Sequence, residues 1–129
     1  MRQLLSLPLI LSLMLLVSCT KINTDELNRN ALTKAQTTIV ALNDLYIPSR
    51  TTYEQVYNLS SEDTKKILNK KVNPYVNRAN DALIYISNLV LIWTNSSQKP
   101  EQYDTAIDEA KTIIPEAVSA MADAIKKPE

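Results

Sequence analysis

Hydrophobic residues recur with helical spacing in three long segments of this 129-residue chain. In the first segment, steps of three and four residues separate the apolar positions, as on one face of an α-helix. These positions are Leu32, Ala35, Ile39, Leu42 and Tyr46. Asn23, with Glu26 three residues later, has the spacing of a capping box and predicts the helix start. Pro48 predicts an end near Ile47, because the residue before a proline disfavours helical geometry.

The second segment follows a connection at 48–60 and has the most regular pattern, a heptad repeat sustained over more than three heptads. Its apolar positions are Leu68, Val72, Tyr75, Ala79, Ala82, Ile86, Leu89 and Trp93. Ser60 or Ser61 is expected to cap this helix, and Pro74 predicts a kink or a brief break just before it.

Residues 83–93 are apolar on nearly every side. Eleven helical residues rise about 16 Å, too little to cross a bilayer core of about 30 Å. A helix that is apolar all round is buried. This segment is therefore expected either to lie between other elements or to contact a partner.

The third segment follows a polar loop at 94–100 and is expected to begin at Pro100. Its apolar face combines two adjacent stripes of residues. Pro115 is expected to kink the helix, and Lys126 and Lys127 are expected to lie at its end. The stripes are Tyr103, Ala106, Ala110, Ile113, Ala117, Ala120 and Ala124, beside Ile107, Ile114, Val118, Met121 and Ile125. The sequence thus predicts an all-α fold, an antiparallel up-down-up three-helix bundle over residues 25–127.

Residues 1–18 have the three parts of a secretory signal peptide. Arg2 supplies the positive charge, the run from Leu4 to Val17 is apolar, and Ser18 is the small residue before the cut. Fourteen helical residues rise about 21 Å, which is short for a membrane span.

The motif Leu16-Val17-Ser18-Cys19 resembles the lipobox of bacterial lipoproteins. The resemblance implies cleavage before Cys19, diacylation of its thiol and acylation of the freed amine, with 19–24 as a lipidated tether. Because no Asp follows the cysteine, the family's sorting rule places the protein in the outer membrane, facing the periplasm. The alternative is an ordinary signal peptide followed by a chance thiol.

The helical layout also resembles that of small lipoproteins encoded by phages and prophages. The matching pieces are Ala35 to Leu42, Ser60-Ser61-Glu62-Asp63 and Ala79-Asn80-Asp81-Ala82-Leu83. The resemblance implies no catalytic residues, and superinfection exclusion is the most specific function that it suggests.

Composition narrows the chemistry further. The chain has no Gly and no His, so glycine-rich phosphate loops, histidine metal ligands and Ser–His or Cys–His nucleophile pairs are excluded. The 14 basic and 14 acidic residues form no long block of one sign, which argues against nucleic acid as a partner. We therefore expect no enzyme activity, no cofactor and no metal.

Two charged clusters are more typical of solvated helix faces than of sites. Asp104, Asp108 and Glu109 lie near a helix N-terminus, where negative charge is stabilising, although paired carboxylates could bind a cation. The second cluster, which consists of lysines, could contact the anionic head groups of lipids. It consists of Lys65, Lys66, Lys70 and Lys71.

The leading hypothesis is a lipid-anchored, non-enzymatic domain that binds another envelope protein. The candidate contact residues are Tyr85, Leu91, Ile92 and Trp93, with Ile84 beside them. Core packing of Trp93 is the favoured alternative, because it is in heptad phase with Leu89. The second hypothesis is a carrier that holds a small apolar ligand between kinked helices, in a cavity lined by Ile86, Leu89 and Ile113.

The lipobox generates a direct test. Replacing Cys19 with Ser should leave an uncleaved precursor, whereas the native chain should gain the mass of its acyl chains and resist salt extraction from membranes. Two or more acyl chains hold a protein stably in a bilayer. Intact mass spectrometry that finds an unmodified thiol in the mature protein would contradict the assignment.

Overall fold

A computed structural model describes the backbone of residues 2–126 and the side chains of residues 26–126. Within these residues every regular element is a helix, so the all-α prediction is confirmed. Four helices are present where three were predicted. They are α1 (Arg2–Leu59), α2 (Glu62–Lys71), α3 (Asn73–Ser96) and α4 (Tyr103–Lys126).

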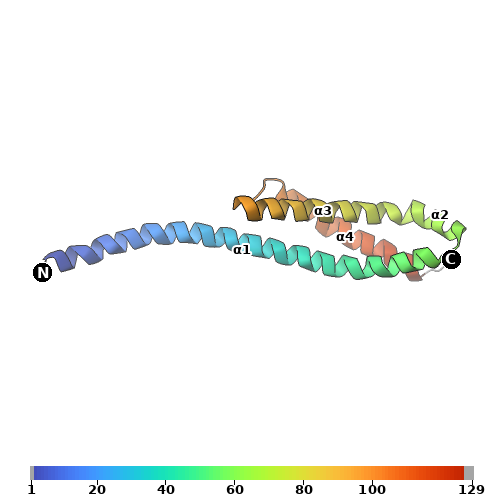
Figure 1. Cartoon of the computed structure of the whole chain (residues 1–129), viewed down its shortest axis with the longest axis horizontal. Coiled ribbons are helices and arrows are strands. Elements are labelled where there is room, and N and C mark those ends of the chain that lie inside the picture. The colour runs from blue at the N-terminus through green and yellow to red at the C-terminus, as the bar shows by residue number, and fades with distance from the viewer. Residues whose placement is uncertain (1, 127–129) are drawn as a thin grey trace.

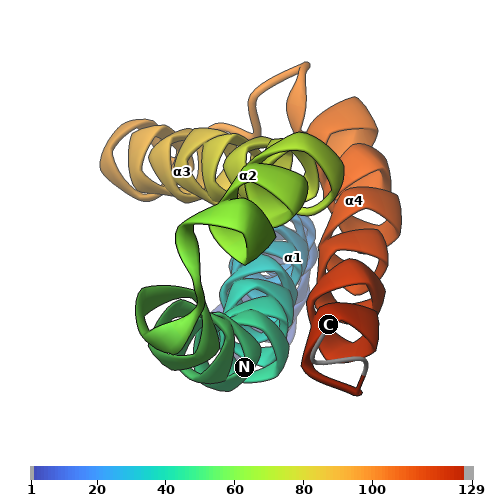
Figure 2. The same ribbon diagram turned by 90° about the vertical axis from the view of Figure 1, so that its right-hand side faces the viewer.

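The chain reverses direction twice (Figure 1). Helices α2 and α3 return along α1 almost end to end, and α4 then runs back obliquely beside them. Viewed along the long axis, α1, the α2–α3 arm and α4 surround a common interior (Figure 2). Each of α1, α3 and α4 packs against the other two.

Helix α1 does not end near Ile47 as predicted; it passes through Pro48 and continues to Leu59. A proline inside a helix costs about 3 kcal/mol, because it removes a hydrogen bond and crowds the preceding turn. Tyr46 and Tyr53 are buried on either side of Pro48, and their seven-residue separation keeps both on one helix face only if the helix continues. Burial of these two rings, with Pro48 on the exposed side, explains why the helix is maintained.

The same helix includes residues 19–24, so the full chain has no helix start at Asn23. Its backbone is helical from the leader onwards, and an apolar leader is itself a good helix former. The tether prediction concerns the chain after cleavage before Cys19 and stays a prediction. Lys127 lies outside the described residues.

The boundaries of the α2–α3 arm follow the predicted signals. Ser61 caps α2, its hydroxyl oxygen accepting a hydrogen bond from the Thr64 N–H at 3.2 Å. The break falls at Val72, and Pro74 lies in the first turn of α3, where its missing N–H is not needed. The predicted break before Pro74 is therefore confirmed.

This break shifts the buried face of the arm. Tyr75, assigned to the core by the heptad pattern, is 39% exposed, and Val76 is buried in its place. Leu83 and Val90 are also buried, because a straight helix repeats every 3.6 residues and drifts from a strict heptad. The remaining heptad positions are buried or partly buried, as predicted.

In α4 both apolar stripes face the interior, as predicted, although the helix begins at Tyr103 and not at Pro100. Ala110, Ala117 and Met121 are fully buried, and the two alanines allow close approach of the neighbouring helices. Pro115 lies within the helix on the exposed side.

Three tyrosines of α1 donate hydrogen bonds to three asparagines of the α2–α3 arm, a set that we call the Tyr–Asn ladder. The hydroxyl-to-Oδ1 distances are 2.6 Å for Tyr46–Asn80, 2.7 Å for Tyr53–Asn73 and 2.8 Å for Tyr57–Asn69. From one pair to the next, α1 advances by seven and then four residues while the arm retreats by the same number. The ladder thus specifies one antiparallel register.

The arm is tied to α1 at its other end as well. The Trp93 indole N–H donates to Asn28 Oδ1 at 3.1 Å, and the Asn28 amide donates to the Ser97 carbonyl at 3.0 Å. Ser97 ends α3 in the left-handed conformation, with φ of 58°. Glycine normally occupies this position. In a chain without glycine, the Asn28 contact holds the turn that leads to α4.

Core packing predicts an asymmetric response to two truncations. Leu89→Ala should cost about 2–5 kcal/mol of unfolding free energy, because it leaves a cavity in the core. Lys70→Ala, on an exposed position, should cost about 0.5 kcal/mol or less. Urea unfolding of the two variants is the measurement, and equal losses would contradict the assigned packing.

The buried tyrosines predict a loss of stability at alkaline pH. Burial, with a smaller contribution from Tyr57, raises the pKa of Tyr53 to about 12, and burial also raises the pKa of Tyr46 and of Tyr103. The unfolded chain therefore releases these protons first. The free energy of unfolding should be unaffected by these groups below pH ~10 and fall between pH ~10 and ~12.

Denaturant unfolding over this pH range, followed by circular dichroism, measures the slope. Tyr53→Phe should make the slope shallower, because it removes one of the shifted groups. An unchanged slope in Tyr53→Phe would show that the Tyr53 hydroxyl is not held in a buried position.

Candidate functional site

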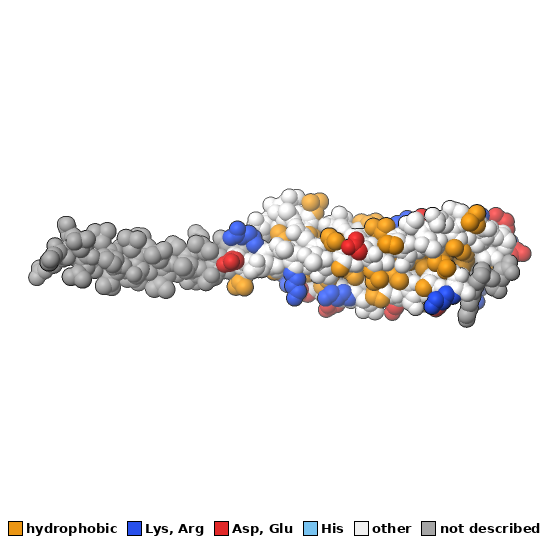
Figure 3. Space-filling view, turned by 90° about the horizontal axis from the view of Figure 1, so that it is seen from below, with side chains coloured by type: hydrophobic (Ala, Val, Ile, Leu, Met, Phe, Trp, Pro, Cys, Tyr) orange, Lys and Arg blue, Asp and Glu red, His pale blue; other side chains and the backbone are white. Residues whose placement is uncertain are grey.

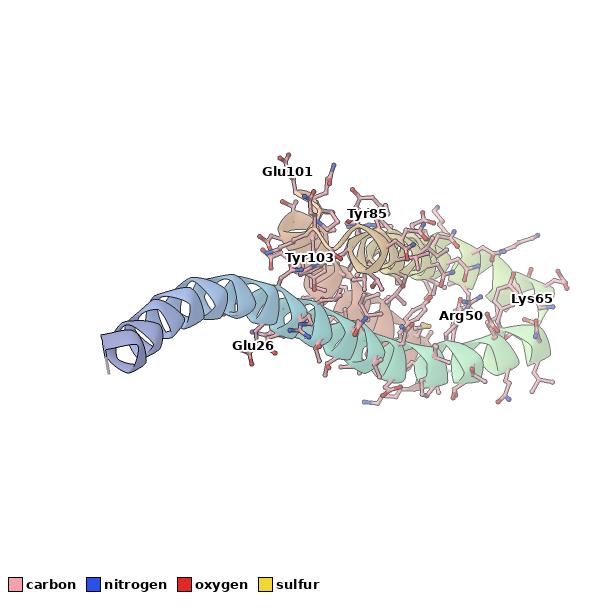
Figure 4. The ribbon with its side chains drawn as sticks, turned by 60° about the vertical axis from the view of Figure 1, so that its left-hand side comes forward. Glu26, Arg50, Lys65, Tyr85, Glu101 and Tyr103 are labelled. Carbon is pink, nitrogen blue, oxygen red and sulfur yellow. The ribbon has the colours of Figure 1, made fainter. Side chains whose placement is uncertain are left out.

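Helix α3 carries a second apolar surface on the side that faces away from the core. Ile84 is 61% exposed, Tyr85 48%, Leu91 58% and Ile92 54%. Three polar residues lie on the same side of the helix, one between the apolar residues and one past each end of them. We call the whole surface the outer face of α3. It comprises Asp81, Ile84, Tyr85, Asn88, Leu91, Ile92 and Asn95. Figure 4 shows Tyr85 on the side of α3 turned away from α1.

Helical geometry explains why this face is left uncovered. At 3.6 residues per turn, the outer face occupies an arc opposite Leu83, Ile86, Leu89, Val90 and Trp93, which build the core. A helix that is apolar on both sides normally lies between two partners. Here α1 and α4 cover only one side.

The structure separates the four predicted contact residues. Tyr85, Leu91 and Ile92 are exposed on the outer face, but Trp93 is 1% exposed and belongs to the core. Its ring packs edge-on against Tyr103, with centroids 5.3 Å apart, and its N–H bonds Asn28. Trp93 as a contact residue is therefore wrong, because the indole needs both an apolar setting and a hydrogen-bond acceptor.

The apolar surface continues from α3 to α1 across a shallow groove of about 510 Å³. Ile84 and Ile47, which is 54% exposed, line its two sides. Tyr46, Arg50 and Asn80 line it as well, with Arg50 Nη1 donating to Asn80 Oδ1 at 3.3 Å.

A larger hollow of about 700 Å³ lies between the end of α1, α2 and the last turns of α4. Its apolar wall includes Leu59, 89% exposed, and Ile67, 54% exposed, with Lys71 and Asp123 also among the lining residues. We call it the α1–α2–α4 groove. The sequence interpretation missed it, because it ended the first helix at Ile47; a recognised helical face through Val56 and Leu59 would have indicated it.

The residues predicted to line a carrier cavity do not lie in the α1–α2–α4 groove. Ile86 and Leu89 are buried, and neither they nor Ile113 lines either of the two hollows. A ligand cavity at these three residues stays a prediction. Helices α3 and α4 pack against each other along this part of the interior.

The acidic cluster is exposed, and Asp104 pairs with Lys99 at 2.8 Å. Among the described side chains, no group of three or more carboxylate, thiol or imidazole ligands could hold a metal ion. Lys65 lies 3.6 Å from Glu62 and over the Tyr57 ring, and the other three lysines of the basic cluster are exposed. Seen from below, charges of both signs are scattered among apolar side chains (Figure 3). These clusters are solvated helix faces.

Cys19 lies within the helical backbone of α1, but its side chain is outside the described side chains. Over the residues described, no helix is both long enough and apolar enough to cross a membrane.

No family model matches the chain, and no curated protein or solved structure matches it either. The resemblance to small phage lipoproteins stays a prediction. What the protein does is therefore inferred from its own side chains, and the outer face of α3 is the surface that most needs an explanation.

Proposed function

We propose that this protein is a lipid-anchored, non-enzymatic component of the bacterial envelope that acts through protein–protein interaction at the outer face of α3. The observation that carries the proposal is the exposure of four large apolar side chains, between 48% and 61%, on a helix whose opposite side builds the core. Exposed apolar patches of this kind, rimmed by polar residues, mark interaction surfaces.

The composition of the face supports a protein partner. Tyrosine and large aliphatic side chains provide the anchors of protein interfaces, and polar groups form the rim. Asp81 and Asn95 lie beyond the two ends of the apolar stretch. The outer face as defined carries no Lys or Arg, so nucleic acid is not the proposed partner.

The proposed anchor places this surface close to a membrane. Lipidated Cys19 precedes the first described side chain, Glu26, by seven residues, and seven extended residues span at most about 25 Å. A mature domain, proposed as a three-helix bundle in which α2 and α3 form one broken arm, would remain near the outer membrane on its periplasmic side. Superinfection exclusion, implied by the resemblance to phage lipoproteins, is the specific role that we propose to test.

The α1–α2–α4 groove supports a second candidate function, the binding of a small apolar ligand. Its volume of about 700 Å³ lies within the usual range of ligand pockets, about 300–1,000 Å³. Its lining combines seven aliphatic side chains with polar and charged groups that could orient a ligand, which are Ser60, Ser61, Thr64, Lys71 and Asp123.

Two matched substitutions distinguish the candidates. Leu91→Asp places a charge on the outer face of α3, and Ile67→Asp places one in the groove, at positions that are 58% and 54% exposed. We expect Leu91→Asp and Tyr85→Ala to abolish protection of a host that expresses the chain against phage infection, measured by plating efficiency. Ile67→Asp should leave protection intact.

All three variants should keep the helical content and melting behaviour of the native chain, because the substituted residues are exposed. The proposal is contradicted if the α3 variants are folded, anchored and fully protective. Loss of activity in Ile67→Asp alone would favour the ligand-binding function.

A further inference from the structure

We propose that the shallow groove between α1 and α3, called here the α1–α3 groove, binds an extended peptide segment that carries a carboxylate, and that Arg50 binds this group. The inference rests on the proposed function, because it names the chemistry that the protein partner presents beside the outer face of α3. The groove shares Ile84 and Asn88 with that face, so one partner can contact both surfaces.

The charge of the groove favours an anionic group. Of the described residues that line it, only Arg50 is charged; the other polar groups are neutral amides and hydroxyls. A guanidinium is planar and always protonated, and its paired N–H groups match the two oxygens of a carboxylate. The ligand that complements this lining therefore carries a carboxylate.

Two neighbours hold the Arg50 guanidinium in place without using all of its donors. Its Nε donates to Glu54 Oε1 at 2.8 Å, and its Nη1 donates to Asn80 Oδ1 at 3.3 Å. Arg50 thus reaches from α1 toward α3 (Figure 4). A guanidinium has more N–H donors than these two bonds use, and Glu54 occupies the Nε side. The edge formed by Nη1 and Nη2 can therefore receive a second carboxylate, and Glu54 acts as a positioning residue.

The amide side chains of the groove match a peptide backbone. Asn43 Nδ2 donates to the Ile39 carbonyl at 3.0 Å, which leaves Oδ1 as an acceptor on the α1 side. On the α3 side, Asn80 Oδ1 accepts from Tyr46 and Arg50, which leaves Nδ2 as a donor. Each peptide group has one N–H donor and one C=O acceptor. An extended chain in the groove can therefore pair with both walls.

The apolar part of the lining favours aliphatic side chains in the ligand. Ile47 and Ile84, which are 54% and 61% exposed, lie on opposite sides of the groove, where each can contact such a side chain. A sugar acid also carries a carboxylate, but its ring would pack on an open aromatic face. Tyr46, the aromatic residue of the described lining, is only 1% exposed. A peptide with aliphatic residues beside its carboxylate is the better fit.

Titration of the isotope-labelled full chain in detergent micelles with matched peptides tests the site. The probes are acetyl-Leu-Ala-Leu with a free carboxylate, the same peptide as its C-terminal amide, and acetyl-Leu-Asp-Leu amide, whose carboxylate is on a side chain. We expect saturable NMR shifts of the Arg50 Nε–H and of the Asn80 side-chain amide with an acidic peptide, and none with the uncharged one.

The acidic probes also distinguish the source of the carboxylate. A response to the free-carboxylate peptide alone assigns the site to a chain terminus, whereas a response to the Asp peptide assigns it to an acidic side chain. An uncharged peptide that binds as well as the acidic ones, or the absence of binding by either acidic peptide, would overturn the proposal.

Two arginine substitutions provide a matched control. Arg50→Gln should weaken binding of the acidic peptide by about ten-fold or more, because it removes the charge-assisted hydrogen bonds to the carboxylate. Arg78→Gln should bind like the native chain, since Arg78 is exposed on α3 and does not line the groove. Both variants should keep the native circular dichroism spectrum. Unchanged binding by folded Arg50→Gln would contradict the assignment of Arg50.

Failure of this inference is distinguishable from failure of the proposed function. If Tyr85→Ala and Leu91→Asp abolish phage protection but neither acidic peptide binds, the proposed function stands and the peptide site is rejected. If an acidic peptide binds through Arg50 while both α3 variants remain protective, the site stands and the proposed function is rejected.

Discussion

The register between α1 and the returning α2–α3 arm is the constraint on which the rest of the structure depends. Amphipathic helices can slide past one another by a turn at modest cost if only apolar side chains meet. Here each tyrosine hydroxyl of α1 must find its asparagine acceptor, and a shift by one turn would leave buried or half-buried polar groups unpaired. Leaving such a group unpaired costs about 1–3 kcal/mol. The Tyr–Asn ladder and the Trp93–Asn28 bond therefore specify the register at both ends.

This register determines what α3 exposes. With Asn80 directed at Tyr46 and Trp93 directed at Asn28, the side of α3 that carries Leu83, Ile86 and Val90 must face the core. The opposite side then faces outward with its own apolar residues. The exposed surface is thus a consequence of the same hydrogen bonds that align the helices, and small rotations of α3 could not hide it without breaking them.

Sequence patterns predicted the parts of the fold that depend on local chemistry. The Ser61 cap, the break before Pro74 and the apolar stripes of α4 follow from residues close together in the chain, and all are observed. The predictions that differ involve distant partners. Pro48 remains within α1 because Tyr46 and Tyr53 are buried against the arm, which no local signal shows. Val76 replaces Tyr75 in the core because the break changes the helix phase.

The outer face of α3 could be predicted from the sequence because the helical periodicity shows which residues lie off the core stripe. Tyr85, Leu91 and Ile92 lie off the core stripe, and all three are exposed; Trp93 lies on it and is buried. The ladder also has a signature in the sequence. Tyr46, Tyr53 and Tyr57 are separated by seven and four residues, and Asn69, Asn73 and Asn80 by four and seven. Such mirrored spacing is what an antiparallel pair of helices requires.

A double-mutant cycle at one step of the ladder tests the central claim most directly. Tyr53→Phe, Asn73→Ala and the double variant would be compared by urea unfolding, with Tyr85→Phe and Asn73→Ala as the control pair, since Tyr85 is exposed on the outer face. The ladder predicts a coupling of about 1 kcal/mol between Tyr53 and Asn73 and additive effects in the control pair. Additive effects of Tyr53→Phe and Asn73→Ala would show that this hydrogen bond does not hold the register, and would contradict the account.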